Sequence, residues 1–355
     1  MIKRFFALFL SLSLLLCGCS VEIVLGPEET IAPAVSGGDA LAVHFIDVGQ
    51  ADCVLIEYGG DFVLIDGGNR DDGQKVISYL QSCGVEELEA VICTHAHEDH
   101  VGGLPAVLAV YPAAQVYAPT KTYSSKVFDD FLYYVDQQRL EVTIPTPGTR
   151  FSLCNDVVLT ILGPVKSYAE TNDTSIVVML EYGSTSFLFT GDMEVAAEND
   201  MLDYWDNQVN WNVDVLKVGH HGSTTSSGYR FVYETDPEYA IISVGEDNSY
   251  GHPHKEIISR YNDAGVPMFR TDELGTILVV SDGHELTVTW ENQNATPENV
   301  EKAEAASVTY IGNKNSKNFH APDCKNLPKE SNRVYFDSYD AAINAGFTPC
   351  GSCLG

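Results

Sequence analysis

A short run of metal-binding side chains constrains this chain more than any other feature. Residues 94–100 (THAHEDH) follow an apolar segment that is typical of a buried strand. Side chains at the end of such a strand project into the crevice where α/β sheets bind ligands. His95 and His97 are two residues apart and point the same way on an extended backbone, so Asp99 and His100 can turn toward a second ion. Imidazole and carboxylate ligands suit zinc, manganese or iron.

Strand-like and helix-like segments alternate through residues 40–290. The strand-like segments are 41–48, 53–58, 62–65, 90–94, 141–144, 157–162, 176–182, 186–190, 213–218, 239–244, 276–280 and 285–290. The helix-like segments are 74–81, 101–110, 124–138, 195–203, 229–235 and 254–263. Gly59-Gly60-Asp61 predicts a hairpin turn between the second and third strands. The strands form two groups, each followed by helices, which predicts a layered α/β domain with mixed sheets.

These motifs together resemble the metallo-β-lactamase fold, and in particular the hydrolase domain of ComEC-type competence proteins. Residues 95–100 match the HxHxDH signature, and residues 44–52 and 64–68 look like the opening of that domain. Further matches are residues 172–175, 189–192, 216–223 and 250–254. The resemblance covers about residues 40–290 and implies a four-layer αββα sandwich with a binuclear metal site between the sheets. Ala51 departs from the family's usual glycine. The membrane-spanning segments of ComEC have no counterpart, which predicts a free-standing, secreted form of the domain.

The resemblance also implies a role for each residue of the site. His95 and His97 would hold the first metal, and Asp99 and His100 the second. Asp192 would bridge both ions. Asp66 would fix a ligand imidazole through its far nitrogen.

One ligand of the second metal is open between His252 and the His220-His221 pair. We favour His252, which leaves His220 and His221 to act with Asp99 in catalysis, as general acid or electrostatic stabiliser facing the substrate.

Many family members carry another histidine just before the strand that leads to the bridging aspartate. Here Asn172 and Asp173 stand in that region, and we expect them to support the ligands. A site richer in oxygen holds its first metal loosely or favours manganese, so the predicted cofactors are two divalent ions, zinc or manganese.

The predicted reaction is hydrolysis by a hydroxide that two metals activate. The ComEC-like motifs favour phosphodiesters, and a nuclease acting on extracellular DNA is the leading hypothesis. The chain has 20 basic and 50 acidic residues, a formal charge of −30, which argues against wrapping nucleic acid over its whole surface. The alternatives are therefore a phosphodiesterase of small or surface esters such as phosphocholine, and a non-catalytic module that binds nucleic acid or envelope polymer. A third alternative is a true β-lactamase.

The N-terminus has the layout of an export signal. Lys3 and Arg4 precede the apolar run 5–16, which is too short to span a bilayer as a mature helix. Gly18-Cys19 then resembles a bacterial lipobox with Cys19 as the lipidated residue, and a plain secretory signal is the alternative. Residues 1–19 would be the lipoprotein signal peptide and 20–39 an aperiodic tether. The predicted location is the extracellular face of the cell membrane, lipid-anchored or secreted, with any DNA uptake requiring a separate channel.

The C-terminus carries a second metal pattern. Polar residues 291–307 predict a linker, and residues 308–355 contain His320, Cys324, Cys350 and Cys353 in two close pairs. This spacing predicts a structural zinc, with a Cys350–Cys353 disulfide as the alternative in an exported protein. The segment resembles the small zinc-binding domain of the Ada DNA-repair protein, and we expect an α+β unit. It is the least acidic part of the chain, so it would either present DNA to the hydrolase domain or act as a stabilising cap.

Overall fold

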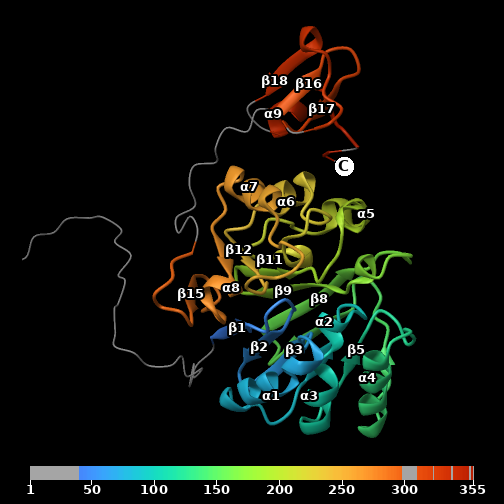
Figure 1. Ribbon diagram of the computed structural model, residues 1–355, viewed down its shortest axis with the longest axis vertical. Coiled ribbons are helices and arrows are strands. Elements are labelled where there is room, and N and C mark those ends of the chain that lie inside the picture. The colour runs from blue at the N-terminus through green and yellow to red at the C-terminus, as the bar shows by residue number, and fades with distance from the viewer. Residues whose placement is uncertain (1–39, 298–309, 323, 337–338, 352, 355) are drawn as a thin grey trace, which may run out of the picture. The chain divides into compact units, whose positions relative to one another are not determined.

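The computed structural model describes residues 40–297, 310–322, 324–336, 339–351 and 353–354 (Figure 1). The predicted signal peptide with Cys19, the tether and most of the predicted linker lie outside these residues. Within the described part of the chain, we find no helix with the length and apolar character needed to cross a bilayer.

The first sheet has eight strands in the order β15-β14-β1-β2-β3-β4-β5-β6. They are β1 (Leu41–Phe45), β2 (Val54–Tyr58), β3 (Asp61–Ile65), β4 (Ala90–Ile92), β5 (Val116–Tyr117), β6 (Val142–Thr143), β14 (Ile277–Ser281) and β15 (Leu286–Trp290). The strands from β15 to β3 pair antiparallel, and those from β3 to β6 pair parallel. Gly59 and Gly60, both at positive φ, form the predicted turn between β2 and β3.

The second sheet has seven strands in the order β13-β12-β11-β10-β9-β8-β7. They are β7 (Arg150–Leu153), β8 (Val157–Gly163), β9 (Val177–Tyr182), β10 (Thr185–Phe189), β11 (Val215–Lys217), β12 (Tyr239–Ile242) and β13 (Met268–Arg270). β7 to β10 pair antiparallel, and β10 to β13 pair parallel. Parallel strands thus lie in both sheets, and their carboxyl ends carry the loops of the candidate site.

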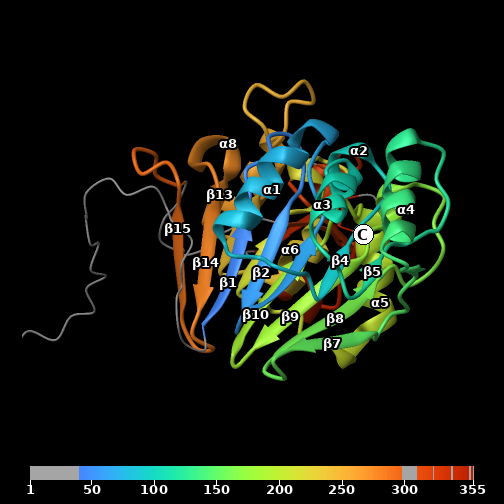
Figure 2. The same ribbon diagram turned by 90° about the horizontal axis from the view of Figure 1, so that it is seen from below.

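Helices cover the outer face of each sheet (Figures 1 and 2). Over the first sheet lie α1 (Gly73–Ser82), α2 (Glu98–Val101), α3 (Leu104–Val110) and α4 (Lys126–Gln137), and over the second lie α5 (Val195–Trp205), α6 (Tyr229–Thr235) and α7 (Lys255–Asp263). α8 (Thr271–Leu274) follows β13. One apolar cluster fills the space between the sheets, and another lies under each helical layer. This is the predicted four-layer αββα sandwich.

The alternation of side chains along the strands explains the layers. In β2, Val54 and Ile56 face the cluster between the sheets, whereas Leu55 faces the helices. In α4, Phe128, Phe131 and Val135 form one buried stripe at helical spacing. Both faces of the central strands are therefore apolar, as the continuous hydrophobic runs in the sequence require.

The C-terminal unit has a four-stranded sheet in the order β18-β16-β17-β19. Its elements are β16 (Tyr310–Asn313), β17 (Asn318–His320), the 3-10 turn Glu330–Asn332, β18 (Arg333–Phe336), α9 (Tyr339–Asn344) and β19 (Thr348–Pro349). A small apolar cluster that includes Phe319, Ala342 and Phe347 lies between the sheet and the helix. The unit is the predicted small α+β domain.

Candidate metal centre

The candidate centre forms where loops from the two sheets meet. β4 leads into the histidine-rich run, and β10 leads into Asp192. His100 Nε2 lies 3.2 Å from Asp192 Oδ1, and His95 Nε2 lies 3.9 Å from Asp192 Oδ2. Residues that are almost a hundred positions apart in the sequence therefore share one site between the sheets.

Four residues, here called the His221 group, converge most closely: Asp99, His100, Asp192 and His221. One ligand atom of each lies within 4.8 Å of the others. His221 Nε2 is 3.4 Å from Asp99 Oδ2 and 3.7 Å from Asp192 Oδ1. His100 Nε2, His221 Nε2 and Asp192 Oδ1 are buried and make no hydrogen bond with any residue that the structure describes. Buried polar atoms without hydrogen bonds are costly, and these imidazole and carboxylate donors fit a divalent cation.

Asp66 holds the far side of His100. Its Oδ2 lies 2.7 Å from His100 Nδ1, and it also accepts hydrogen bonds from the Thr94 N–H (2.7 Å) and hydroxyl (2.6 Å). Asp66 has φ of 59°, a conformation that a non-glycine residue rarely adopts. The contact fixes the Nδ1–H tautomer of His100 and turns its Nε2 toward the His221 group. Asp66 thus contacts the far nitrogen of an imidazole, which is the contact predicted for it.

His95 and His97 form a second pair of imidazoles in the site. His95 Nε2 lies 3.1 Å from His97 Nδ1, and the two rings are edge to face. Asp192 Oδ2 faces this pair, at 3.9 Å from His95 Nε2, and it also lies 3.6 Å from His220 Nε2. Asp192 thus directs one oxygen to each set of imidazoles, which is the arrangement that a bridging carboxylate needs.

The structure places His221, and not the predicted His252, in the group with Asp99, His100 and Asp192. His221, 1% exposed, points into this group because His220 and His221 adopt positive φ values of 50° and 53° in the turn after β11. His252 instead stacks on the outer side of His221, with ring centroids 6.4 Å apart, and its Nδ1 contacts Gln50 Nε2 at 3.3 Å. His220 is the member of the pair that keeps some exposure, 22%.

Asn172 and Asp173 act on Glu194 rather than on His95 or His97. Asn172 Nδ2 donates to Glu194 Oε1 (3.1 Å), and Asp173 Oδ1 accepts from the Glu194 N–H (3.1 Å). Glu194 Oε1 in turn lies 3.5 Å from His220 Nδ1. Asn172 Nδ2 also lies 3.5 Å from both ring nitrogens of His220. Asn172 therefore supports His220 directly and Asp173 supports it through Glu194, a residue that the sequence analysis did not single out.

The sequence analysis also missed a buried ion pair between Asp52 and Lys217. Their side chains are 4% and 2% exposed. Both residues lie in the motifs quoted above, and a lysine inside the apolar strand β11 was the available signal. A charge in such a strand needs a buried partner.

The electrostatics of the site follow from burial and from its carboxylates. Burial alone would lower the pKa of His221, but Asp192 and Asp52 raise it to about 10. Burial would raise the pKa of Asp52, but Lys217 and His221 lower it to about 2. Burial and the neighbouring histidine charges lower the pKa of His252 to about 4. At neutral pH the centre therefore combines ionised carboxylates with a neutral His252.

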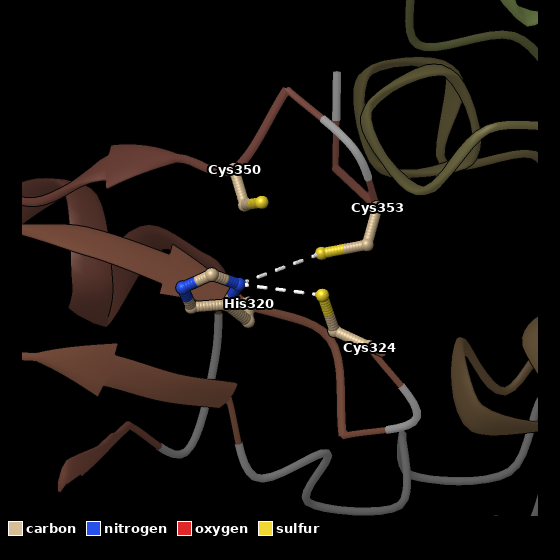
Figure 3. A group of neighbouring side chains, drawn as sticks. All are labelled: His320, Cys324, Cys350 and Cys353. Atoms are coloured by element: carbon tan, nitrogen blue, oxygen red, sulfur yellow. Dashed lines mark hydrogen bonds between the residues drawn. The ribbon is translucent and has the colours of Figure 1, made fainter. Parts of the chain in front are cut away.

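The C-terminal unit contains a separate group of His320, Cys324, Cys350 and Cys353, here called the thiol group (Figure 3). β17 and β19 are parallel neighbours, so His320 at the end of one lies beside Cys350 after the other. His320 Nδ1 lies 3.3 Å from Cys324 Sγ and 4.0 Å from Cys353 Sγ. The described cysteines form no disulfide, and this set of one imidazole and three thiols fits zinc.

The fold and the centre define an αββα metal-dependent hydrolase. Residues 46–246 match the family model of the metallo-beta-lactamase superfamily, and residues 298–354 match that of the metal binding domain of Ada. The chain belongs to the metallo-beta-lactamase superfamily.

Curated relatives include the competence proteins of bacteria. The chain is 31% identical over 254 residues to ComE operon protein 3 of Bacillus subtilis, which covers 66% of this chain and 32% of that protein. It is 29% identical over 237 residues to competence protein ComA of Neisseria gonorrhoeae, with the same coverage of both. The chain thus spans about a third of the length of these relatives. A solved structure, the metallo-beta-lactamase fold protein YhfI of Bacillus subtilis, is similar at 13% identity, with a TM-score of 0.47, 69% of this chain and 100% of that chain covered.

Proposed function

We propose that this protein is a metal-dependent phosphodiesterase that cleaves DNA. The observation that carries the proposal is the carboxylate of Asp192, which directs one oxygen to His95 and His220 and the other to His100 and His221. His95, His97 and Asp192 would hold one cation, and the His221 group the other. Two cations bound there would act as Lewis acids and lower the pKa of a water molecule, which is the chemistry that phosphodiester cleavage requires.

The chain's own residues would orient the substrate and the ligands. Asp66 holds His100 through Nδ1, so this ligand needs no reorganisation during the reaction. His220 is partly exposed and is held by Thr225 Oγ1 at 3.0 Å and by Glu194. It is therefore placed to contact the phosphate, where it would stabilise charge that develops in the transition state.

The choice of DNA rests on the relatives. The sequence is similar to competence proteins over about two thirds of the chain, and competence is the uptake of DNA. The chain's charge of −30 is unfavourable for binding a long polyanion, so we propose that a single strand enters only at the centre, where bound cations would offset the carboxylates.

We further propose that the protein works on the outer face of the cell membrane, held by a lipid on Cys19. The basis is the charged and apolar N-terminal segment that ends in Gly18-Cys19. Membrane fractions of cells that express the Cys19→Ser variant should lack the protein, which should appear in the soluble or secreted fraction instead. Equal membrane association of both proteins would contradict the lipid anchor.

The activity is tested with single-stranded DNA and, separately, with bis(p-nitrophenyl) phosphate, each with Mn²⁺ or Zn²⁺. Asp99→Ala removes an oxygen of the His221 group and should lower the rate at least about 100-fold. Asp129→Ala, on the exposed side of α4, is the matched control and should be fully active.

Three outcomes are informative. Cleavage of DNA that Asp99→Ala abolishes supports the proposal. Cleavage of the small ester alone would replace DNA by a small or surface phosphodiester as substrate. No cleavage of either compound by the metal-loaded protein would refute the proposed phosphodiesterase activity.

A further inference from the structure

A buried ion pair joins the two sheets behind the metal centre. Asp52 belongs to the connection between β1 and β2 of the first sheet, and Lys217 is the last residue of β11 in the second. The pair is almost wholly shielded from solvent, as the exposures given above show. Burying two charges is costly unless both are well placed, so the pair needs an explanation beyond stability.

Asp52 lies directly behind two imidazoles of the His221 group. Its Oδ1 is 3.3 Å from His221 Nδ1, and its Oδ2 is 3.8 Å from His100 Nδ1. His221 Nδ1 also lies 2.9 Å from the carbonyl oxygen of Ser243. With two oxygens facing it, Nδ1 carries the hydrogen, so the lone pair of neutral His221 is on Nε2, which faces Asp99 and Asp192. Carboxylates and carbonyls in this position commonly orient metal-binding histidines.

The same carboxylate belongs to a second acidic cluster. One ligand atom each of Asp52, Asp66 and His100 lie within 4.8 Å of one another, and all three residues are buried. Such a cluster attracts a cation, and it lies next to the centre that binds the catalytic ions. The ammonium group of Lys217 already forms an ion pair with Asp52 there. The chain itself thus supplies the positive charge at this position.

We propose that Lys217 is the built-in cation of the Asp52, Asp66 and His100 cluster, and that Asp52 and Lys217 together position His221 for metal binding. Lys217 holds the Asp52 carboxylate in place through the buried ion pair, and Asp52 accepts the Nδ1–H of His221. The inference rests on the proposed function only in that the His221 group holds a metal, and it does not depend on the substrate.

The test measures the affinity of the full chain for Mn²⁺ by the EPR signal of the free ion. The thiol group is filled with zinc beforehand, and Mn²⁺ competes poorly for thiolates, so the titration reports the hydrolase domain. The variants are Asp52→Asn, Lys217→Gln, Lys217→Arg and the double variant Asp52→Asn/Lys217→Gln. Lys75→Gln is the matched control, because Lys75 forms an exposed ion pair with Asp47.

We expect Asp52→Asn to weaken Mn²⁺ binding about 10- to 100-fold, and Lys217→Arg to restore most of what Lys217→Gln loses. The double variant removes both charges and should fold even where Lys217→Gln does not. Its Mn²⁺ affinity should stay as low as that of Asp52→Asn. The absorption bands of the Co²⁺-loaded Asp52→Asn variant should also shift, because the ligand field at His221 changes. The Lys75→Gln control should match the wild-type protein.

Wild-type Mn²⁺ affinity in Asp52→Asn or in the double variant would overturn the inference and leave the pair with a structural role alone. Absence of Mn²⁺ binding by the hydrolase domain of the wild-type protein would overturn it as well. A wild-type protein that binds Mn²⁺ but cleaves no phosphodiester would instead refute the proposed function and leave this inference standing.

Discussion

The two metal-binding regions of this protein differ in what surrounds them. The hydrolase centre lies at the edge of two sheets that share a large apolar cluster, with two further clusters under the helices. The thiol group lies beside a single small cluster in a four-stranded unit. In the first region the fold holds the ligands in place for the metal. In the second, the metal would hold a fold that has too little apolar surface of its own.

The metal-binding side chains of the two regions also differ in chemistry and in exposure. The hydrolase centre offers imidazoles and carboxylates, and the Asp99 side chain remains 30% exposed, as a centre open to substrate requires. The thiol group offers three sulfur atoms and one nitrogen, of which His320, Cys324 and Cys350 are buried. This is the closed, soft ligand set of a structural zinc site.

Removal of metal gives the largest expected difference between the regions. A strong chelator should unfold the C-terminal unit, because zinc contributes about 10 kcal/mol or more to the folding of small domains of this kind. The hydrolase domain should keep its cooperative thermal transition. Limited proteolysis with mass spectrometry distinguishes the two, with new cleavage expected only within residues 310–354. Cys350→Ser should have the same effect without chelator, whereas Cys154→Ser, an exposed cysteine of the hydrolase domain, should not. Simultaneous unfolding of both regions would contradict the claim that only the C-terminal unit needs metal to stay folded.

The hydrolase domain should depend instead on its buried charges. Lys217→Gln removes the ammonium partner of the buried Asp52 carboxylate, and breaking a buried pair in this way typically costs about 3 to 5 kcal/mol of unfolding free energy. Lys75→Gln breaks an exposed pair, and its cost should be below about 1 kcal/mol. Urea unfolding of the metal-free protein, monitored by tryptophan fluorescence, measures both. Equal costs for the two substitutions would mean that the interior tolerates the lone carboxylate.

A buried carboxyl group of the hydrolase domain should respond to pH in the opposite direction to the thiol group. Thiol ligands must lose their protons to bind zinc, so the C-terminal unit should lose metal as the pH falls. In the hydrolase domain, Glu198 on α5 is buried, and it accepts hydrogen bonds from the N–H groups of Ser227 and Gly228. Burial raises its pKa to about 7, against the opposing effects of these hydrogen bonds and of Arg260.

Because the folded state holds this proton more tightly than the unfolded state, the resulting stability is fully present below the ordinary pKa near 4.5 and is lost as the pH rises through 7. The loss should be at most about 3 kcal/mol. Glu198→Gln should therefore flatten the dependence of the unfolding free energy between pH 5 and pH 8. Glu234→Gln, an exposed residue of α6, should leave the dependence as it is. An unchanged pH dependence in Glu198→Gln would show that Glu198 stays ionised.

Sequence patterns predicted the layers well because most strands are long apolar runs with clear turns. They missed β5, β7 and β13, which have two, four and three residues, because so short a segment shows no clear periodicity. At the site, the run after β4 and Asp192 in the turn after β10 were predictable, since both closely follow apolar strands. The choice among the later histidines was not, because it depends on the positive φ values at His220 and His221. Periodicity carries no information about such a turn.

The variant with the smallest expected effect tests whether His221 or His252 binds the metal. His252→Ala removes a ring that stacks on His221, a contact worth about 0.5 to 1.5 kcal/mol, so Mn²⁺ affinity should fall no more than about tenfold. His221→Ala removes a nitrogen of the metal-binding group itself, and its loss should be much larger, while the zinc content of the thiol group stays the same in both variants. A titration of each variant with Mn²⁺, with the thiol group loaded with zinc beforehand and no free zinc present, compares them. A greater loss for His252→Ala would mean that the loop carrying His252 moves inward when metal binds and replaces His221 as a ligand.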